Sequence, residues 1–218
     1  MAKKDRTGNR KKRDQRKQFK VPELGYYLIV TDTEATECCF FTGLHQALPE
    51  DVRNKLVKKV VETKTRTMIE KCLELTAYDA QYRIPWIVFD RDQVQGFDEI
   101  IKEAEDKGVQ AGWSNPCFEI WMYAYFGSMP AIQESWTCCA DFGRVYETKT
   151  GQKYSKADEQ MYGKLCKFGD EEKAIQIAQQ KLEQCKREGK TKSSEMYPCT
   201  TVHELVDEIQ KKHNKIED

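Results

Sequence analysis

The sequence lacks a hydrophobic segment long enough to cross a membrane. Its longest apolar run, residues 118–126, is interrupted by Glu119 and is far shorter than the roughly 20 residues that a bilayer requires. The first twenty residues are almost entirely polar and contain no secretory hydrophobic segment. We therefore expect a cytoplasmic protein with no membrane partner.

The nine cysteines lack the spacing of a metal finger or of a redox motif, because no Cys-x-x-Cys occurs. An odd number of cysteines without secretory context favours reduced thiols over a disulfide framework. Two pairs are vicinal, Cys38-Cys39 and Cys138-Cys139. A zinc site could use Cys199, His203 and one vicinal pair, but this spacing matches no finger pattern, so buried or idle thiols are favoured.

The chain has no net charge, but its charges are unevenly distributed. Residues 1–20 carry ten Lys or Arg against two Asp. A basic arm on an acidic body predicts a flexible segment that binds nucleic acid. A solubilising terminus, or a tail docked on the acidic surface of the body, is an equally weighted alternative. The candidate nucleic-acid-binding residues are Arg10, Lys11, Lys12, Arg13, Arg16 and Lys17.

Two apolar segments end abruptly in acidic residues. Each segment predicts a strand buried on both faces, one at residues 25–30 and the other at residues 84–89. Such strands are typical of a parallel sheet covered by helices. Asp32 follows the first segment, and Asp90 and Asp92 follow the second. The carboxyl ends of parallel strands form the edge where ligands bind in open α/β sheets.

These acidic ends predict a metal site. Because side chains alternate along a strand, we expect Asp90 and Asp92 to point to one side and Arg91 to the other. If the two strands are neighbours, Asp32 joins them, and three close carboxylates favour a bound Mg²⁺ or Mn²⁺. The structural alternative is a solvated Asp pair that begins a turn, and spacing alone favours neither.

Strands and helices alternate along residues 21–130, which predicts a parallel α/β sheet with right-handed crossovers. We expect further strands at 58–63 and 109–113, and helices at 37–48, from 51, and at 66–78 and 97–107. Residues 136–151 are expected to be irregular, with helices at 156–167, 170–187 and 201–212, the last opened by a Thr201–Glu204 capping box. The expected organisation is an arm at 1–20, an α/β domain at 21–130 and a helical C-terminal lobe at 131–218 packed on it.

A buried helix is also expected to begin near residue 115. Asn115 could cap its first turn, with Pro116 at the first helical position. Glu119 is the only formally charged side chain between Trp113 and Pro130. Such a carboxylate is rarely left unpaired, so we expect Glu119 either to pair with a buried base or to face the acidic site.

Four motifs and the basic arm together resemble the RloB/AbiLii family of phage-defence proteins, over essentially the whole chain. The motifs are LIVTDTEATE (residues 28–37), VFDRD (88–92), SNPCFEIW (114–121) and PCTTVHEL (198–205). The resemblance implies a Toprim-like (Rossmannoid) parallel sheet flanked by helices, with a C-terminal helical lobe. It also implies a role in abortive infection or restriction.

The resemblance further implies a catalytic site, because Toprim domains hold magnesium with a Glu after the first strand and an Asp-x-Asp after the third. The implied metal ligands and catalytic residues are Asp32, Asp90 and Asp92, with Glu37 and Glu119 as auxiliary catalytic carboxylates and Arg91, Ser114 and Asn115 as substrate-binding residues. The chain departs from the family pattern at two places. Asp32-Thr33 replaces Glu-Gly, and Tyr125-Phe126 replaces His-Phe.

The leading functional hypothesis is a metal-dependent nuclease that hydrolyses phosphodiester bonds of DNA or RNA, with tRNA among the candidate substrates, in antiphage defence. The alternative is a non-catalytic adaptor with a degenerate site, which binds nucleic acid or a protein. A third hypothesis is an enzyme that acts only with a separate ATPase partner. The chain has no Gly-x-x-x-x-Gly-Lys-Ser/Thr loop, so ATP hydrolysis would have to come from that partner.

Overall fold

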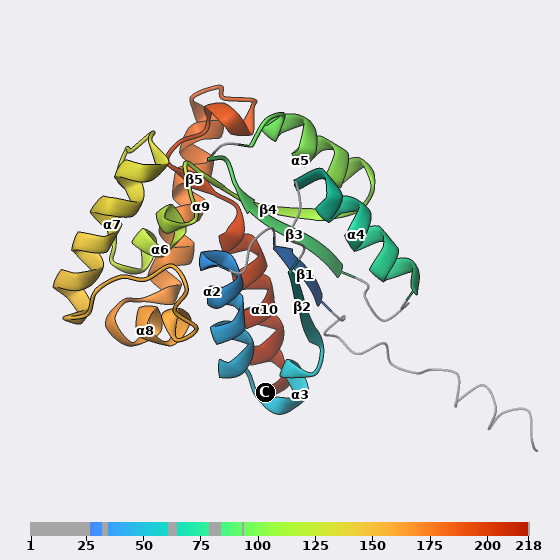
Figure 1. Ribbon diagram of the computed structural model, residues 1–218, viewed down its shortest axis with the longest axis horizontal. Coiled ribbons are helices and arrows are strands. Elements are labelled where there is room, and N and C mark those ends of the chain that lie inside the picture. The colour runs from blue at the N-terminus through green and yellow to red at the C-terminus, as the bar shows by residue number, and fades with distance from the viewer. Residues whose placement is uncertain (1–26, 32–34, 61–64, 79–83, 93, 218) are drawn as a thin grey trace, which may run out of the picture.

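A five-stranded sheet runs through the centre of the protein (Figure 1). The computed structural model describes residues 27–31, 35–60, 65–78, 84–92 and 94–217. The strands lie in the order β2-β1-β3-β4-β5, of which the first four are parallel and β5 is antiparallel to β4. Their bounds are β1 (Tyr27–Thr31), β2 (Leu56–Val60), β3 (Ile84–Asp90), β4 (Gln110–Asn115) and β5 (Cys199–Thr200).

Helices cover both faces of the sheet, with α4 and α5 on one side and α2 and α10 on the other (Figure 1). The helices are α2 (Thr36–Ala47), α3 (Glu50–Arg53), α4 (Thr65–Tyr78), α5 (Phe97–Asp106), α6 (Glu119–Tyr125), α7 (Ser135–Thr150), α8 (Met161–Phe168), α9 (Glu171–Arg187) and α10 (Val202–Glu217), with a 3₁₀ turn, η2 (Ser193–Glu195). The predicted α/β Rossmannoid class is therefore confirmed. The strand order reverses between β1 and β3, which makes the carboxyl ends of these strands the topological switch point.

The central strands are buried on both faces, as their apolar runs predict. In β1, Tyr27 and Ile29 pack in the core on the α2 and α10 side, whereas Leu28 and Val30 pack in the core beneath α4 and α5. Strand β3 follows the same alternation, and Val88 lies on the α2 side. Two-residue periodicity therefore places Asp90, at the end of β3, on the side that also carries α6 and α7.

Most predicted helices are confirmed, with ends that shift by a few residues. The expectation of irregular structure at 136–151 is wrong, because these residues form the 16-residue helix α7. Cys138, Phe142 and Tyr146 recur every four residues and form its buried face. The other faces mix apolar residues such as Trp136 and Val145 with Thr, Gly and charged residues, which weakens this pattern in the sequence. The helix expected at 156–167 begins only at Met161.

The expected helix start at Asn115 is also wrong, because β4 continues through this residue and α6 begins at Glu119. Asn115 pairs with Cys199 in β5. Its side-chain Nδ2 donates to the backbone oxygens of Ser193 and Ser194, at 3.2 Å each. Pairing with β5 therefore takes the place of helix capping at this position.

The capping box expected at Thr201 does not form. The Thr201 hydroxyl instead accepts a hydrogen bond from the backbone nitrogen of Trp113 at 3.0 Å and donates one to the backbone oxygen of Ala111 at 2.9 Å. These contacts attach the start of α10 to the edge of β4. The C-terminal region thus adds a strand to the sheet as well as helices, while the domain boundary at residue 130 stays a prediction.

None of the helices within the described residues is both long enough and apolar enough to span a bilayer.

Candidate functional site

The two acidic residues at the end of β3 open into a broad cavity. Asp90 is partly buried and Asp92 is exposed. The backbone nitrogens of Arg91 and Asp92 donate to the backbone oxygens of Ser114 and Pro116, at 2.9 and 3.1 Å. These bonds hold the chain after β3 against the carboxyl end of β4.

Arg91 lies on the same cavity as both aspartates. The strand alternation from which the opposite orientation of Arg91 was predicted does not extend to this residue. The reason is that β3 ends at Asp90 and the chain turns. The backbone nitrogen of Val94 donates to the backbone oxygen of Arg91 at 2.9 Å, so strand alternation no longer applies. Arg91 therefore contributes a cation to the acidic edge.

The cavity has a volume of about 1030 Å³ and lies between the sheet edge, the connection from β4 to α6, and the first turns of α7. Its floor and walls mix carboxylates, cations, thiols and aromatic rings. The side chains that line it and bear on its chemistry are Asp90, Arg91, Asp92, Asn115, Cys117, Glu134, Trp136, Cys139, Tyr154 and Lys156. Trp136, at 74% exposure, is one of two large hydrophobic side chains that are highly exposed among the described residues.

Glu119 is only 1% exposed and lies in the first turn of α6. Its Oε1 accepts a hydrogen bond from the Tyr154 hydroxyl at 2.8 Å and lies 3.5 Å from Nζ of Lys156. Burial alone would raise the pKa of Glu119, but Lys156 and the hydrogen bonds from Tyr154 and Cys117 bring the pKa below its ordinary value. Glu119 thus pairs with a base, but Lys156 is exposed rather than buried as the first of the two alternatives expected.

The buried carboxylate also acts on its partner. Burial lowers the pKa of Lys156, but the charge of Glu119 outweighs this effect and raises the pKa above its ordinary value. Lys156 is consequently a permanent cation on the wall of the cavity. With Arg91, it supplies positive charge opposite the aspartates, which suits a phosphate-bearing ligand.

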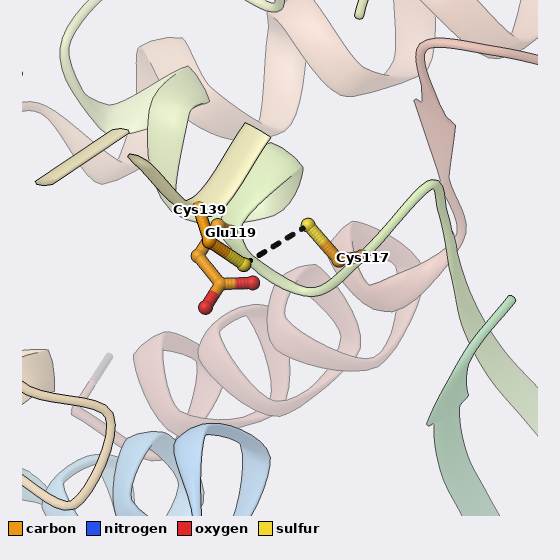
Figure 2. Close-up of side chains that lie close together, drawn as sticks. All are labelled: Cys117, Glu119 and Cys139. Atoms are coloured by element: carbon orange, nitrogen blue, oxygen red, sulfur yellow. Dashed lines mark hydrogen bonds between the residues drawn. The ribbon is translucent and has the colours of Figure 1, made fainter. Parts of the chain in front are cut away.

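Cys117, Glu119 and Cys139 form a compact group beside this cavity (Figure 2). One potential ligand atom from each lies within 4.8 Å of the others. The Cys139 thiol donates a hydrogen bond to Sγ of Cys117 at 3.9 Å. This hydrogen bond and burial raise the pKa of Cys139, so its thiol is protonated when no cation is present.

The sequence reasoning did not find this group. The zinc site that the sequence suggested used Cys199 and His203 instead, but neither belongs to a group of three or more potential metal ligands among the described residues. The Nδ1–H of His203 donates to the backbone oxygen of Thr200 at 2.9 Å. A signal was available in the Cys-Phe-Glu spacing of residues 117–119 and in the vicinal pair at 138–139. Only the packing of α6 against α7 brings Cys139 to the other two residues.

The other predicted site residues fall in three places. Asp32 and the basic residues of the arm lie outside the described residues. Glu37 is buried in the first turn of α2 and is not among the described residues that line the cavity. Ser114 is fully buried, and its hydroxyl forms a 2.9 Å hydrogen bond with that of Thr200.

Asn115 does line the cavity, and its buried Oδ1 has no hydrogen-bond partner among the described residues. The structure thus brings Asp90, Arg91, Asp92 and Asn115 together, with Glu119 behind the wall that carries Lys156. Substrate binding by Arg91, Ser114 and Asn115 stays a prediction.

Comparison with known proteins identifies the family. No curated protein and no solved structure matched the chain. A family model described as RloB-like protein matches residues 27–209, which is most of the chain. The protein therefore belongs to the RloB-like family.

Proposed function

We propose that this protein is a Mg²⁺- or Mn²⁺-dependent nuclease that acts in bacterial antiphage defence. The observation that carries the proposal is the position of Asp90 and Asp92, which line a broad cavity at the carboxyl edge of the sheet, beside the β1/β3 switch point. Membership of the RloB-like family supports the defence role. A cytoplasmic location accords with this role.

The donor set suits a hard divalent cation. Asp90 and Asp92 offer carboxylate oxygens, and Mg²⁺ commonly binds through one or two carboxylates while it keeps several waters. Asp32, which follows β1 directly, is the proposed third ligand. When bound, the cation would activate a water and neutralise charge on the phosphate.

The chain's own side chains would bind and orient the nucleic acid. Arg91 and Lys156 present cations to the same cavity and can pair with phosphate oxygens. Trp136 offers an exposed ring on which a nucleobase can stack, an interaction that tolerates any base. Because Glu119 is buried and already bound to Tyr154 and Lys156, we assign it to positioning Lys156 rather than to proton transfer.

The experiment is cleavage of a mixed panel of DNA, bulk RNA and tRNA by the purified protein, with Mg²⁺ or Mn²⁺ and with EDTA. We expect one class of substrate to be cut only when the metal is present. Asp90→Asn and Asp92→Asn should each lower the rate by on the order of 100-fold, since a metal ligand contributes several kcal/mol to the transition state.

The matched control is Asp106→Asn, which removes an exposed carboxylate at the end of α5, just before β4 begins at the opposite edge of the sheet. This variant should cleave like the wild type. Nucleic-acid binding without cleavage under any metal condition would favour the adaptor instead. Cleavage that appears only after addition of a defence-locus ATPase and ATP would favour the partner-dependent enzyme.

A further inference from the structure

The group formed by Cys117, Glu119 and Cys139 has the composition of a transition-metal site. Thiolate sulfur is a soft ligand that selects Zn²⁺ and related ions over Mg²⁺. Cys117 and Glu119 are nearly inaccessible, while Cys139 is partly exposed, and both cysteines line the cavity. A cation could therefore reach the group from the cavity without unfolding the core.

The spacing of the ligand atoms fits a tetrahedral ion. With Zn–S near 2.3 Å and Zn–O near 2.0 Å, the edges of the tetrahedron measure about 3.5–3.8 Å. The two sulfur atoms lie 3.9 Å apart, and all three ligand atoms lie within 4.8 Å. A disulfide would require the sulfurs to approach to about 2.05 Å, so the present geometry is closer to a shared ion than to a covalent bond.

The side chains around the group complete the site. In Figure 2 the two sulfur atoms face each other and the Glu119 carboxylate lies beside the Cys139 sulfur. The Tyr154 hydroxyl donates to Oε1 of Glu119, and such outer hydrogen bonds orient metal-binding carboxylates. Lys156 lies 3.5 Å from the same oxygen.

The charges balance when an ion is bound. Two thiolates and one carboxylate exceed the charge of a divalent cation by one negative unit, and the Lys156 ammonium offsets that unit. The two thiol protons leave to solvent as the ion binds. Three protein ligands also leave one tetrahedral position open, as in catalytic rather than structural zinc sites.

We propose that Cys117, Glu119 and Cys139 bind Zn²⁺, with the fourth coordination position open to the cavity that Asp90 and Asp92 also line. This site is separate from the Mg²⁺ or Mn²⁺ site of the proposed nuclease. It would place a second, chemically distinct cation near a bound phosphate. The proposal does not depend on nuclease activity, because zinc binding is measured directly.

The first test uses Co²⁺ as a spectroscopic probe of the reduced, metal-free full-length protein. We expect one equivalent of Co²⁺ to produce thiolate-to-metal charge-transfer absorption and the visible bands of a tetrahedral ion, and Zn²⁺ but not excess Mg²⁺ to abolish them. Cys117→Ser, Cys139→Ser and Glu119→Gln should each weaken Zn²⁺ binding by at least about 100-fold, beyond the 10–100-fold typical of outer contacts.

The matched control is Cys166→Ser, because Cys166 is an exposed thiol on α8 and should not contribute. A Co²⁺ spectrum without thiolate bands would overturn the proposal. So would loss of the signal in Cys138→Ser with retention in Cys139→Ser, because the neighbouring thiol would then be the ligand.

A second test needs no variant and so does not depend on the stability of a mutant. Alkylation of the wild-type protein, read residue by residue by mass spectrometry, should show that Zn²⁺ protects Cys139 and that a chelator restores its reactivity. Cys166 should react equally with and without Zn²⁺. Protection of Cys185 or Cys199 in place of Cys139 would assign the ion to another part of the fold and contradict the proposal.

Discussion

The Tyr154 hydroxyl donates a 2.8 Å hydrogen bond to the carboxylate of Glu119 and thereby joins the segment after α7 to the first turn of α6. The carboxylate is inaccessible to solvent, so it depends on the interactions made by Tyr154, Lys156 and Cys117. The hydrogen bond from Tyr154 therefore supports both the packing of this region and the carboxylate that pairs with Lys156 on the cavity wall.

Removal of that hydroxyl should destabilise the protein. We expect Tyr154→Phe to lower the free energy of unfolding by about 1.5–3 kcal/mol, since a buried charged group loses a hydrogen bond. The control is Tyr146→Phe, because the buried Tyr146 hydroxyl has no hydrogen-bond partner among the described residues. That variant should be neutral or slightly stabilising. Urea denaturation measures both variants. If Tyr154→Phe and Tyr146→Phe lose the same free energy of unfolding, the hydrogen bond to Glu119 makes no specific contribution.

Asp90 and Asp92 should affect stability differently with and without metal. In metal-free buffer we expect Asp90→Asn and Asp92→Asn to be neutral or stabilising, because each removes one of two like charges on the same cavity. Wild type should gain about 2.7 kcal/mol when Mn²⁺ is present at 100 times its dissociation constant, and the variants should not. Thermal melting measures both effects. A pair that merely begins a turn would lose stability on substitution and show no response to Mn²⁺.

His203 should make the protein less stable in mild acid. Burial lowers the pKa of His203, although the Thr200 carbonyl and Asp207 act in the opposite direction. The folded pKa of His203 lies below the unfolded value of about 6.5. The contribution of His203 to the free energy of unfolding is therefore fully present above that pH and is lost as the pH falls through the folded pKa. The loss can reach about 1.4 kcal/mol per pH unit.

The measurement is urea denaturation of wild type and His203→Asn between pH 7 and pH 5. Asn cannot take up the proton but can still donate to Thr200 from a similar position, so the curve of the variant should fall less steeply. Parallel curves for the two proteins would assign the acid sensitivity to other groups, such as His45, whose pKa is also lowered by burial.

Close packing of α2 on α8 predicts opposite effects at two glycines. A Cβ at Gly43 would lie 2.7 Å from Cβ of Tyr162 and 3.2 Å from the backbone oxygen of Glu159, so Gly43→Ala should cost about 1–3 kcal/mol. A Cβ at Gly163 would meet nothing within 4 Å. Gly163→Ala should therefore stabilise α8 by about 0.5–1 kcal/mol. The measurement is the denaturation midpoint of each variant. An unchanged midpoint for Gly43→Ala would mean that α2 and α8 can move apart to admit the added methyl group.

The basic arm should contribute affinity for nucleic acid but not catalysis. Deletion of residues 1–20 removes ten cationic side chains. The slope of the logarithm of the binding constant against the logarithm of the salt concentration should become shallower by about one unit for each phosphate contact that the deletion abolishes. Any metal-dependent cleavage should retain its metal requirement. Unchanged affinity and salt dependence would identify the arm as a solvated tail.

Local pattern was sufficient to predict the α/β class and the acidic edge. Strands β1 and β3 are nearly continuous apolar runs because both of their faces are buried, and this property is visible residue by residue. Strand β3 ends at the cavity, and Asp90 follows the same alternation as Trp86 and Val88, so spacing alone could assign Asp90 to the cavity side. The predicted orientations of Arg91 and Asp92 assumed that strand alternation continues, whereas the chain turns after Asp90.

The sequence by itself therefore determined the four parallel strands, most of the helices and the position of the acidic edge, because these depend on apolar runs and on the helical period of about four residues. Only the tertiary structure decided which residues meet across elements. Strand β5 has two residues, too few to show a period, and it pairs with a strand more than 80 residues away. Cys139 reaches Cys117 and Glu119 only because α7 packs beside α6, and no local rule specifies the rotation of one helix against another.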